Sequence, residues 1–125
     1  MKEKVLHLKS KKFATRIINM YKYLCKEKKE FVISKQVLRS GTSIGANVAE
    51  ANSAFSKKDF ICKLGISLKE CSETAHWLDI LKDTDFLSEK AYESIHSDCI
   101  EITKLLTSSI KTAKRNMELE EKQKK

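Results

Sequence analysis

The chain has 125 residues, no proline and only three glycines, and its formal net charge is +8. This length is typical of one domain with one core. The shortage of turn residues excludes a β-sandwich or barrel. The hydrophobic fraction of 41% excludes a disordered chain, and the charged fraction of 34% excludes a membrane protein. The composition therefore predicts an all-α domain.

Apolar periodicity predicts two helices in the first half of the chain. The first has apolar residues at steps of three and four, and the charged run over residues 25–30 ends it. Its seam is Phe13, Ile17, Tyr21 and Leu24. The second helix has a heptad-like seam of apolar and small residues. This seam is Val37, Gly41, Ile44, Val48, Ala51 and Phe55.

Two further helices are predicted in the second half. The third begins at Ser56, which forms an S-x-x-D capping pattern with Asp59, and it ends near residues 83–85. Its seam is Phe60, Leu64, Ser67, Cys71, Ala75 and Leu78. The fourth follows Ser88, a candidate N-cap. Its seam is Tyr92, Ile95, Cys99, Ile102, Leu106, Ser109 and Ala113.

Short connections between these helices force neighbours to run antiparallel. The economical architecture is an up-down-up-down four-helix bundle over residues 1–115, followed by a charged, frayed tail over residues 116–125. No segment is apolar enough to cross a membrane. The four cysteines form no C-x-x-C pair and fall within helical patterns, and no signal peptide is present, so we expect buried free thiols and a cytoplasmic protein.

The second predicted helix is rich in residues that form helices poorly, and each interior glycine costs about 1 kcal/mol relative to alanine. Gly41, Gly45 and Ala49 are spaced four apart and form a small-residue stripe that would let another backbone approach closely. A second stripe is polar. It is either solvated or part of a buried or interfacial hydrogen-bond network. Its members are Ser40, Ser43, Asn47 and Glu50.

Two charged residues lie at the ends of this segment, Arg39 just before the polar stripe and Glu50 as its last member. Arg39 and Glu50 are eleven residues apart, or about 16 Å along a helix axis. They cannot pair with each other, so each needs a partner on another helix or another subunit. Glu70 and Glu73 are candidate partners for Arg39.

Positive charge is concentrated at the start of the chain. Residues 1–30 contain ten basic and three acidic residues, a net charge of +7, whereas residues 85–110 carry a net charge of −3. The basic first segment is therefore expected either to pair with the acidic fourth helix or to present a face that binds polyanions. The candidate phosphate-binding residues are Lys9, Lys11, Lys12, Arg16 and Lys22.

No motif for catalysis is found, and we predict no enzyme activity, no cofactor and no metal site. Cys71, His76, His96 and Cys99 are the one set that could form a zinc site, but Cys71 and His76 are five residues apart and point in different directions. The interleaved aromatics and glycines of RNA-binding folds are also absent. Any nucleic-acid binding would therefore depend on phosphate contacts and shape.

Three segments together resemble a known bacterial family. They are R-S-G-T-S-I-G-A-N-V-A-E-A over residues 39–51, S-K-K-D-F-I over residues 56–61 and L-K-E-C-S-E-T-A-H-W-L over residues 68–78. This pattern is similar to that of the 23S rRNA intervening-sequence proteins, four-helix bundles often described as ribosomal-protein-like. The match is continuous from about residue 35 to residue 81. Its motif positions are Arg39, Ser40, Ser43, Asn47, Glu50, Asp59, Phe60, Glu70 and Glu73.

The resemblance implies a ring-like homo-oligomer, expected to be a pentamer, and carries over no catalytic residue. A related accessory protein of retroelements binds reverse transcriptase and nucleic acid. The motif positions, with Gly41 and Gly45, are expected to serve structure or an interface. Two functions are therefore expected as alternatives. The chain is either a non-enzymatic oligomeric bundle that associates with RNA or DNA through a basic surface, or a scaffold whose ring docks a protein partner.

Overall fold

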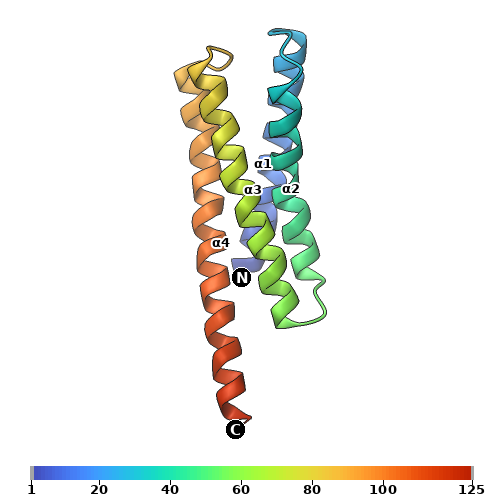
Figure 1. Ribbon diagram of the computed structural model, residues 1–125, viewed down its shortest axis with the longest axis vertical. Helices are drawn as coiled ribbons and strands as arrows, with labels where there is room; N and C mark the ends of the chain where they lie inside the picture. Colours follow the sequence, from blue (N-terminus) through green and yellow to red (C-terminus); the bar gives the residue numbers. More distant parts are fainter. Residues whose placement is uncertain (1, 125) are drawn as a thin grey trace.

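The computed structural model describes residues 2–124 and confirms the four-helix bundle (Figure 1). Helix α1 spans Lys2–Lys26, α2 spans Ile33–Asn52, α3 spans Lys57–Asp83 and α4 spans Glu89–Gln123. The described part of the chain contains no strand.

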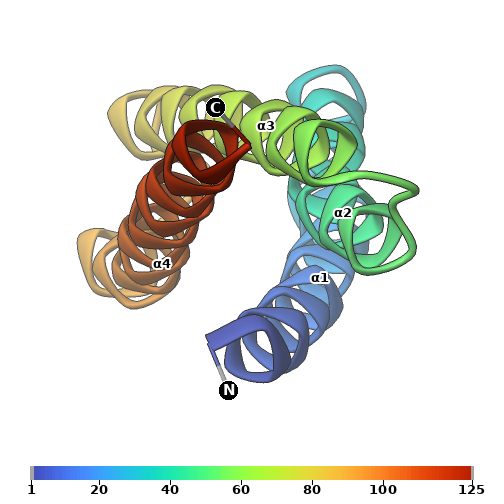
Figure 2. The same ribbon diagram turned by 90° about the horizontal axis from the view of Figure 1, so that it is seen from below.

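The helices alternate in direction, and each packs against its two neighbours in the order α1, α2, α3, α4 and back to α1 (Figure 2). Contact is most extensive between α2 and α3 and least extensive between α4 and α1. The closing pair of the bundle is therefore its most loosely packed pair.

The predicted seams meet in one core. Ile17, Ile44, Leu78 and Leu106 are completely buried, one from each helix. Burying a side chain of this size stabilises the fold by about 1.5–3 kcal/mol. The core also contains buried residues that the predicted seams did not include. These are Leu6, Ser10, Met20, Thr74 and Leu81.

Two sequence expectations about burial are wrong. Phe55 was placed on the α2 seam but is 103% exposed, because α2 ends at Asn52 and the chain has already turned when it reaches residue 55. Cys62 is exposed rather than buried, whereas Cys71 and Cys99 are buried as expected and all four thiols are free. Helical spacing predicts which residues are buried only within the helix itself, and not beyond its last residue.

The two predicted N-caps of the second half are confirmed. The Ser56 hydroxyl accepts a hydrogen bond from the Asp59 N–H at 3.0 Å, and the Ser88 hydroxyl accepts one from the Ala91 N–H at 3.1 Å. Each cap satisfies a helix N–H that has no partner within the helix. These two bonds fix where α3 and α4 begin.

The start of α2 is capped by a residue that the sequence analysis did not single out. The Glu30 carboxylate accepts hydrogen bonds from the backbone N–H groups of Val32, Ile33 and Ser34, at 3.2, 3.1 and 2.6 Å. Burial by itself would raise the pKa of Glu30, but these N–H donors together lower it. The negative charge also suits the positive end of the α2 dipole.

Helix α4 does not end near residue 116. It continues to Gln123 and projects beyond the other three helices (Figure 1). Residues 116–123 are mainly good helix formers, and Glu120 pairs with Lys57 of α3, which supports the extension. None of the helices described is long and apolar enough to span a membrane.

Candidate nucleic-acid interface and the motif on α2 and α3

The glycines of α2 bring its backbone close to α1. A methyl group added at Gly41 would lie 2.8 Å from Cγ1 of Ile17, and one added at Gly45 would lie 3.3 Å from the backbone oxygen of Ser10. The expected close approach is therefore found, and it occurs between two helices of the same chain. Ala49 is exposed, so the stripe acts through its two glycines.

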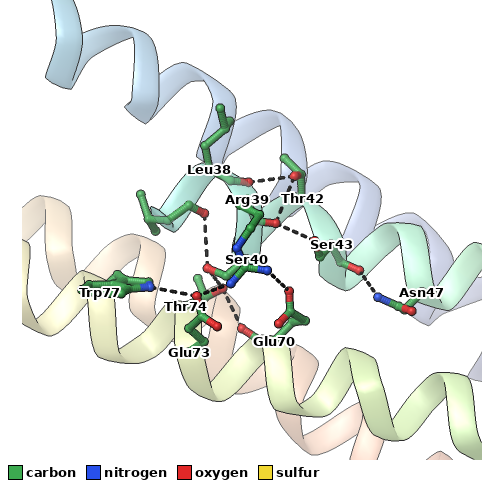
Figure 3. Close-up of polar contacts among 11 residues, drawn as sticks. Leu38, Arg39, Ser40, Thr42, Ser43, Asn47, Glu70, Glu73, Thr74 and Trp77 are labelled. Carbon is green, nitrogen blue, oxygen red and sulfur yellow. Dashed lines mark hydrogen bonds and ion pairs between the residues drawn. The ribbon is translucent and has the colours of Figure 1, made fainter. Parts of the chain in front are cut away.

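On its other side, α2 contacts α3 through a charged group (Figure 3). Arg39 Nη1 donates to Glu70 Oε2 at 3.0 Å, and Nη2 donates to Glu73. The indole N–H of Trp77 also donates to Glu73, at 3.0 Å. The prediction that Glu70 and Glu73 pair with Arg39 is confirmed.

The same contacts change the acidity of the groups involved. The Trp77 N–H and then the Arg39 guanidinium lower the pKa of Glu73, because both favour its ionised form. The pKa of Arg39 is raised, chiefly by its hydrogen bond to Glu73. Arg39 is half exposed, so this group is an ion-pair cluster at the rim of the α2–α3 contact rather than a buried one.

Below the charged group, buried hydroxyls join α2 to α3. The hydroxyls of Ser40 and Thr74 are hydrogen-bonded at 2.9 Å, and Ser67 donates to the backbone oxygen of Ile44 at 2.8 Å. All three hydroxyl-bearing residues are completely buried. The polar stripe of α2 therefore enters a buried network at Ser40.

The remainder of the polar stripe is arranged differently. Ser43 donates to the backbone oxygen of Arg39 at 2.6 Å, and the Asn47 amide donates to the backbone oxygen of Ser43 at 2.9 Å, all within α2 (Figure 3). Glu50 lies 3.7 Å from the ammonium group of Lys63 on α3. The stripe therefore divides into three parts: Ser40 belongs to the buried network with α3, Ser43 and Asn47 bond within α2, and Glu50 pairs with Lys63 at the exposed side of α3.

The two other motif positions lie at the start of α3. Asp59 contributes its backbone N–H to the cap described above. Phe60 is half-buried and lines a hollow of about 400 Å³ that also contains Ser109 of α4. Both residues thus help to shape the end of the bundle where α2 turns into α3.

The candidate phosphate-binding residues of α1 form two groups. Lys9 pairs with Glu101 at 3.0 Å, and Arg16 pairs with Asp98 at 2.7 Å. Both partners belong to the acidic part of α4. Lys9 and Arg16 therefore follow the first of the two expectations, pairing of the basic segment with the acidic fourth helix. These exposed pairs are each worth about 0–1 kcal/mol.

The second group faces away from the bundle. At about 100° per residue, the lysines of this group lie within an arc of about 100° on α1 that contains no acidic residue. We call this arc the outward face of α1. It contains Lys4, Lys11, Lys12, Lys22 and Lys26, all exposed. Within residues 2–124, no carboxylate lies close enough to any of these lysines to form an ion pair.

The cysteines and histidines considered for zinc do not converge. Cys99 Sγ lies 3.5 Å from the backbone oxygen of Cys71, and the two thiols are buried side by side. His76 and His96 instead pack against aromatic rings, at 5.0 and 4.8 Å between ring centroids. In the part of the chain that the structure describes, no three His, Cys, Asp or Glu side chains are grouped to hold a metal ion.

Sequence reasoning missed a groove between α1 and α4. It has a volume of about 790 Å³, and residues 85–88 of the connection between α3 and α4 form part of its lining. It brings together an aromatic residue of α1, Tyr23, and one of that connection, Phe86. No local pattern joins positions so far apart in the sequence. The groove can be found only once the bundle order is known.

Comparison with known proteins identifies the family. Residues 2–108 match the family model described as 23S rRNA-intervening sequence protein. A crystal structure of a protein of unknown function from the S23 ribosomal protein family of Bacteroides thetaiotaomicron is 57% identical, with a TM-score of 0.88 over 89% of this chain and 99% of that chain. None of the curated proteins matches. The chain therefore belongs to the 23S rRNA-intervening sequence protein family.

Proposed function

We propose that the chain is a non-enzymatic, cytoplasmic protein that associates with RNA or DNA through the outward face of α1. The observation that supports this function is the set of exposed lysines on that face with no acidic partner in the described residues. Phosphate binding needs positive charge near the strand and little else. The family description, which concerns an intervening sequence of 23S rRNA, is consistent with a nucleic-acid partner.

The structure refines which cations should contribute most. Lys9 and Arg16 are already compensated by carboxylates of α4, whereas Lys11, Lys12 and Lys22 are not. A lysine without a partner gives up no ion pair when a phosphate arrives. We therefore assign the larger share of phosphate contacts to these three lysines.

The experiment is fluorescence anisotropy with a structured RNA and a DNA duplex of equal length, at about 50 and about 200 mM salt. The variant is Lys11→Ala/Lys12→Ala/Lys22→Ala. If each lysine neutralises one duplex phosphate, the slope of log affinity against log salt becomes shallower by about 2.7.

The matched control is Lys35→Ala/Lys58→Ala/Lys69→Ala, which also removes three exposed lysines and also changes the net charge from +8 to +5. It should retain most of the wild-type slope. Equal losses in the two triple variants would show that net charge, and not the outward face of α1, determines binding. Absence of binding by the wild type at low salt would reject the function.

We also propose that the chain assembles as a ring-like homopentamer. Two adjacent large apolar residues that are exposed on the single chain, Phe31 and Val32, support self-association. In a ring, the basic face is repeated by symmetry, and the repeated patches together create an extended region of positive electrostatic potential. Native mass spectrometry should give about 72 kDa, five times 14.4 kDa. A mass of one chain at micromolar concentration would contradict this proposal.

The alternative function is a scaffold that docks a protein partner without binding nucleic acid. The exposed Phe55 at the turn between α2 and α3 favours it, because a fully exposed aromatic ring is a common anchor in protein interfaces. Under this alternative, Phe55→Ser would abolish capture of the partner, and binding would tolerate added salt. A steep salt dependence with RNA or DNA would favour the first function instead.

A further inference from the structure

We propose that the groove between α1 and α4 binds an unpaired nucleotide of an RNA or DNA strand, with its base against apolar and aromatic side chains and its phosphates at the cationic rim. This inference depends on the proposed function, because it assigns a second contact to a strand held by the outward face of α1. The two contacts differ in chemistry. The face recognises phosphate alone, whereas the groove recognises a base that has left its helix.

The floor of the groove is apolar. Met20 of α1, Leu87 of the connection and Ile95 of α4 are buried beneath it, and Phe86 is half-buried in its wall. Asp85 turns the chain here with a φ of 66°, and the N–H groups of Phe86 and Leu87 both donate to the backbone oxygen of Leu81. These hydrogen bonds hold the connection against the end of α3, where Leu87 contributes to the apolar floor.

Tyr23 supplies an accessible ring at the edge of this floor. It lines the groove and is 44% exposed, so a base could stack on it without displacing a core residue. Proteins that hold single strands combine such rings with cations that follow the backbone. The volume of about 790 Å³ lies within the range of ligand pockets, roughly 300–1,000 Å³.

The charges that line the groove favour an anion. Three cations line it, of which Lys28 and Lys90 are uncompensated and Arg16 is already paired with Asp98, and Asp85 is the one carboxylate among the described lining residues. Arg16 is held in place by Asp98 and by the Ser94 hydroxyl, at 2.7 and 3.1 Å, so its guanidinium is already oriented. Lys28 and Lys90 have no ion-pair partner among residues 2–124. Lys28 lies in the connection between α1 and α2, and Lys90 lies in the first turn of α4.

The groove lies beside the outward face of α1. Tyr23 and Lys26 are three residues apart and are therefore neighbours on the helix surface, although the lysines of the outward face do not themselves line the groove. A strand that follows the lysines of the outward face would therefore arrive at Tyr23. An acidic protein helix could use the same cations, but it would not need the exposed ring, and this is why we favour a nucleotide.

The test is anisotropy with a labelled single-stranded oligouridine of about 15 nucleotides and with an RNA duplex of the same length. Tyr23→Ala should weaken binding of the single strand about tenfold and leave duplex binding almost unchanged, since stacking needs an unpaired base. Tyr23→Phe should retain single-strand affinity. Ile18→Ala, which removes another exposed apolar side chain of α1 outside the groove, is the matched control and should have no effect.

A second variant tests the cations. Lys28→Ala/Lys90→Ala should make the salt slope for the single strand shallower by about 1.4. The inference is overturned if Tyr23→Ala binds the single strand as tightly as the wild type, or if it weakens strand and duplex equally. In either case wild-type binding would still uphold the proposed function. If the wild type binds neither probe, the proposed function fails and the inference fails with it.

Discussion

Helix α2 packs against its two neighbours in opposite ways. Toward α1 it presents glycines, and atoms of Ile17 and Ser10 occupy the space that side chains would otherwise fill. Toward α3 it presents Arg39 and Ser40, whose side chains reach across to partners. The contact of α2 with α1 depends on the glycines having no side chain, whereas its contact with α3 depends on specific polar side chains. The two should therefore respond differently to substitution.

This difference explains how α2 can tolerate a sequence that forms helices poorly. Glycine destabilises an isolated helix, but here it permits close packing against the core residue Ile17. The buried hydroxyls on the opposite side are each satisfied across the interface or within the helix, so they incur no penalty for an unpaired group. Helix α2 is therefore stabilised by its packing against α1 and α3 rather than by the helix propensity of its own residues.

The largest expected effect follows from filling the space at Gly41. Gly41→Leu should lower the free energy of unfolding by about 3 kcal/mol, because the new side chain overlaps Ile17, which is buried in the core. Thermal unfolding monitored by circular dichroism should show a fall in Tm of roughly 12 °C.

Gly65 on α3 offers the matched control, because a methyl group added there meets no atom within 4 Å. Gly65→Ala should raise the free energy of unfolding by up to about 1 kcal/mol through helix propensity alone. If Gly41→Leu is as stable as the wild type, close packing of α1 against α2 is not what the glycine provides.

A smaller loss is expected on the α3 side. Ser67→Ala removes the buried hydrogen bond to the backbone oxygen of Ile44 and should lower the free energy of unfolding by about 1 kcal/mol. Ser43→Ala removes a hydroxyl that bonds only within α2 and should change stability by less than about 0.5 kcal/mol. Equal effects in urea titrations of the two variants would contradict the distinction between the two parts of the polar stripe.

The charged rim should contribute less than the buried hydrogen bond of Ser67, and its contribution should depend on pH. The pKa of Glu73 is lowered below its ordinary value of 4.5, so its contribution to stability is present above that pH and is lost as the pH falls through the lowered value. We expect Glu73→Gln to be less stable than the wild type by about 0.5 kcal/mol at neutral pH. The two should converge once the pH has fallen below the lowered pKa of Glu73, as measured by urea unfolding over a series of pH values from neutral downward. A gap that is the same at every pH of the series would show that ionisation of Glu73 contributes nothing.

Much of this architecture could be predicted from the sequence because helical periodicity and caps are local signals. The four helices, the caps at Ser56 and Ser88 and the pairing of Arg39 with Glu70 and Glu73 were all predicted correctly. Arg39 could be paired because its distance from Glu50 excluded a partner within the same helix. Helical spacing and capping patterns were sufficient to predict a feature wherever it depended on one face or one end of a single helix.

The features that were missed depend on where helices end and on which helices become neighbours. Phe55 continues the α2 period, but the helix stops at Asn52, and no strong signal marks that boundary. The division of the α1 cations into paired and unpaired groups depends on how α1 is rotated and registered against α4, which brings Lys9 to Glu101 and Arg16 to Asp98. The same arrangement brings Tyr23 and Phe86 into one groove. These are properties of the tertiary arrangement and leave no trace in spacing.

The loose contact between α1 and α4 has a consequence for motion. Ion pairs from Lys9 and Arg16 hold this side of the bundle, and salt weakens exposed ion pairs. Amide hydrogens along α1 and α4 should therefore exchange faster than those along α2 and α3, and faster still as salt is added. Opening of this side would widen the groove beside it. Ionic strength would then set how long the groove stays open, as well as how strongly a phosphate is attracted to it.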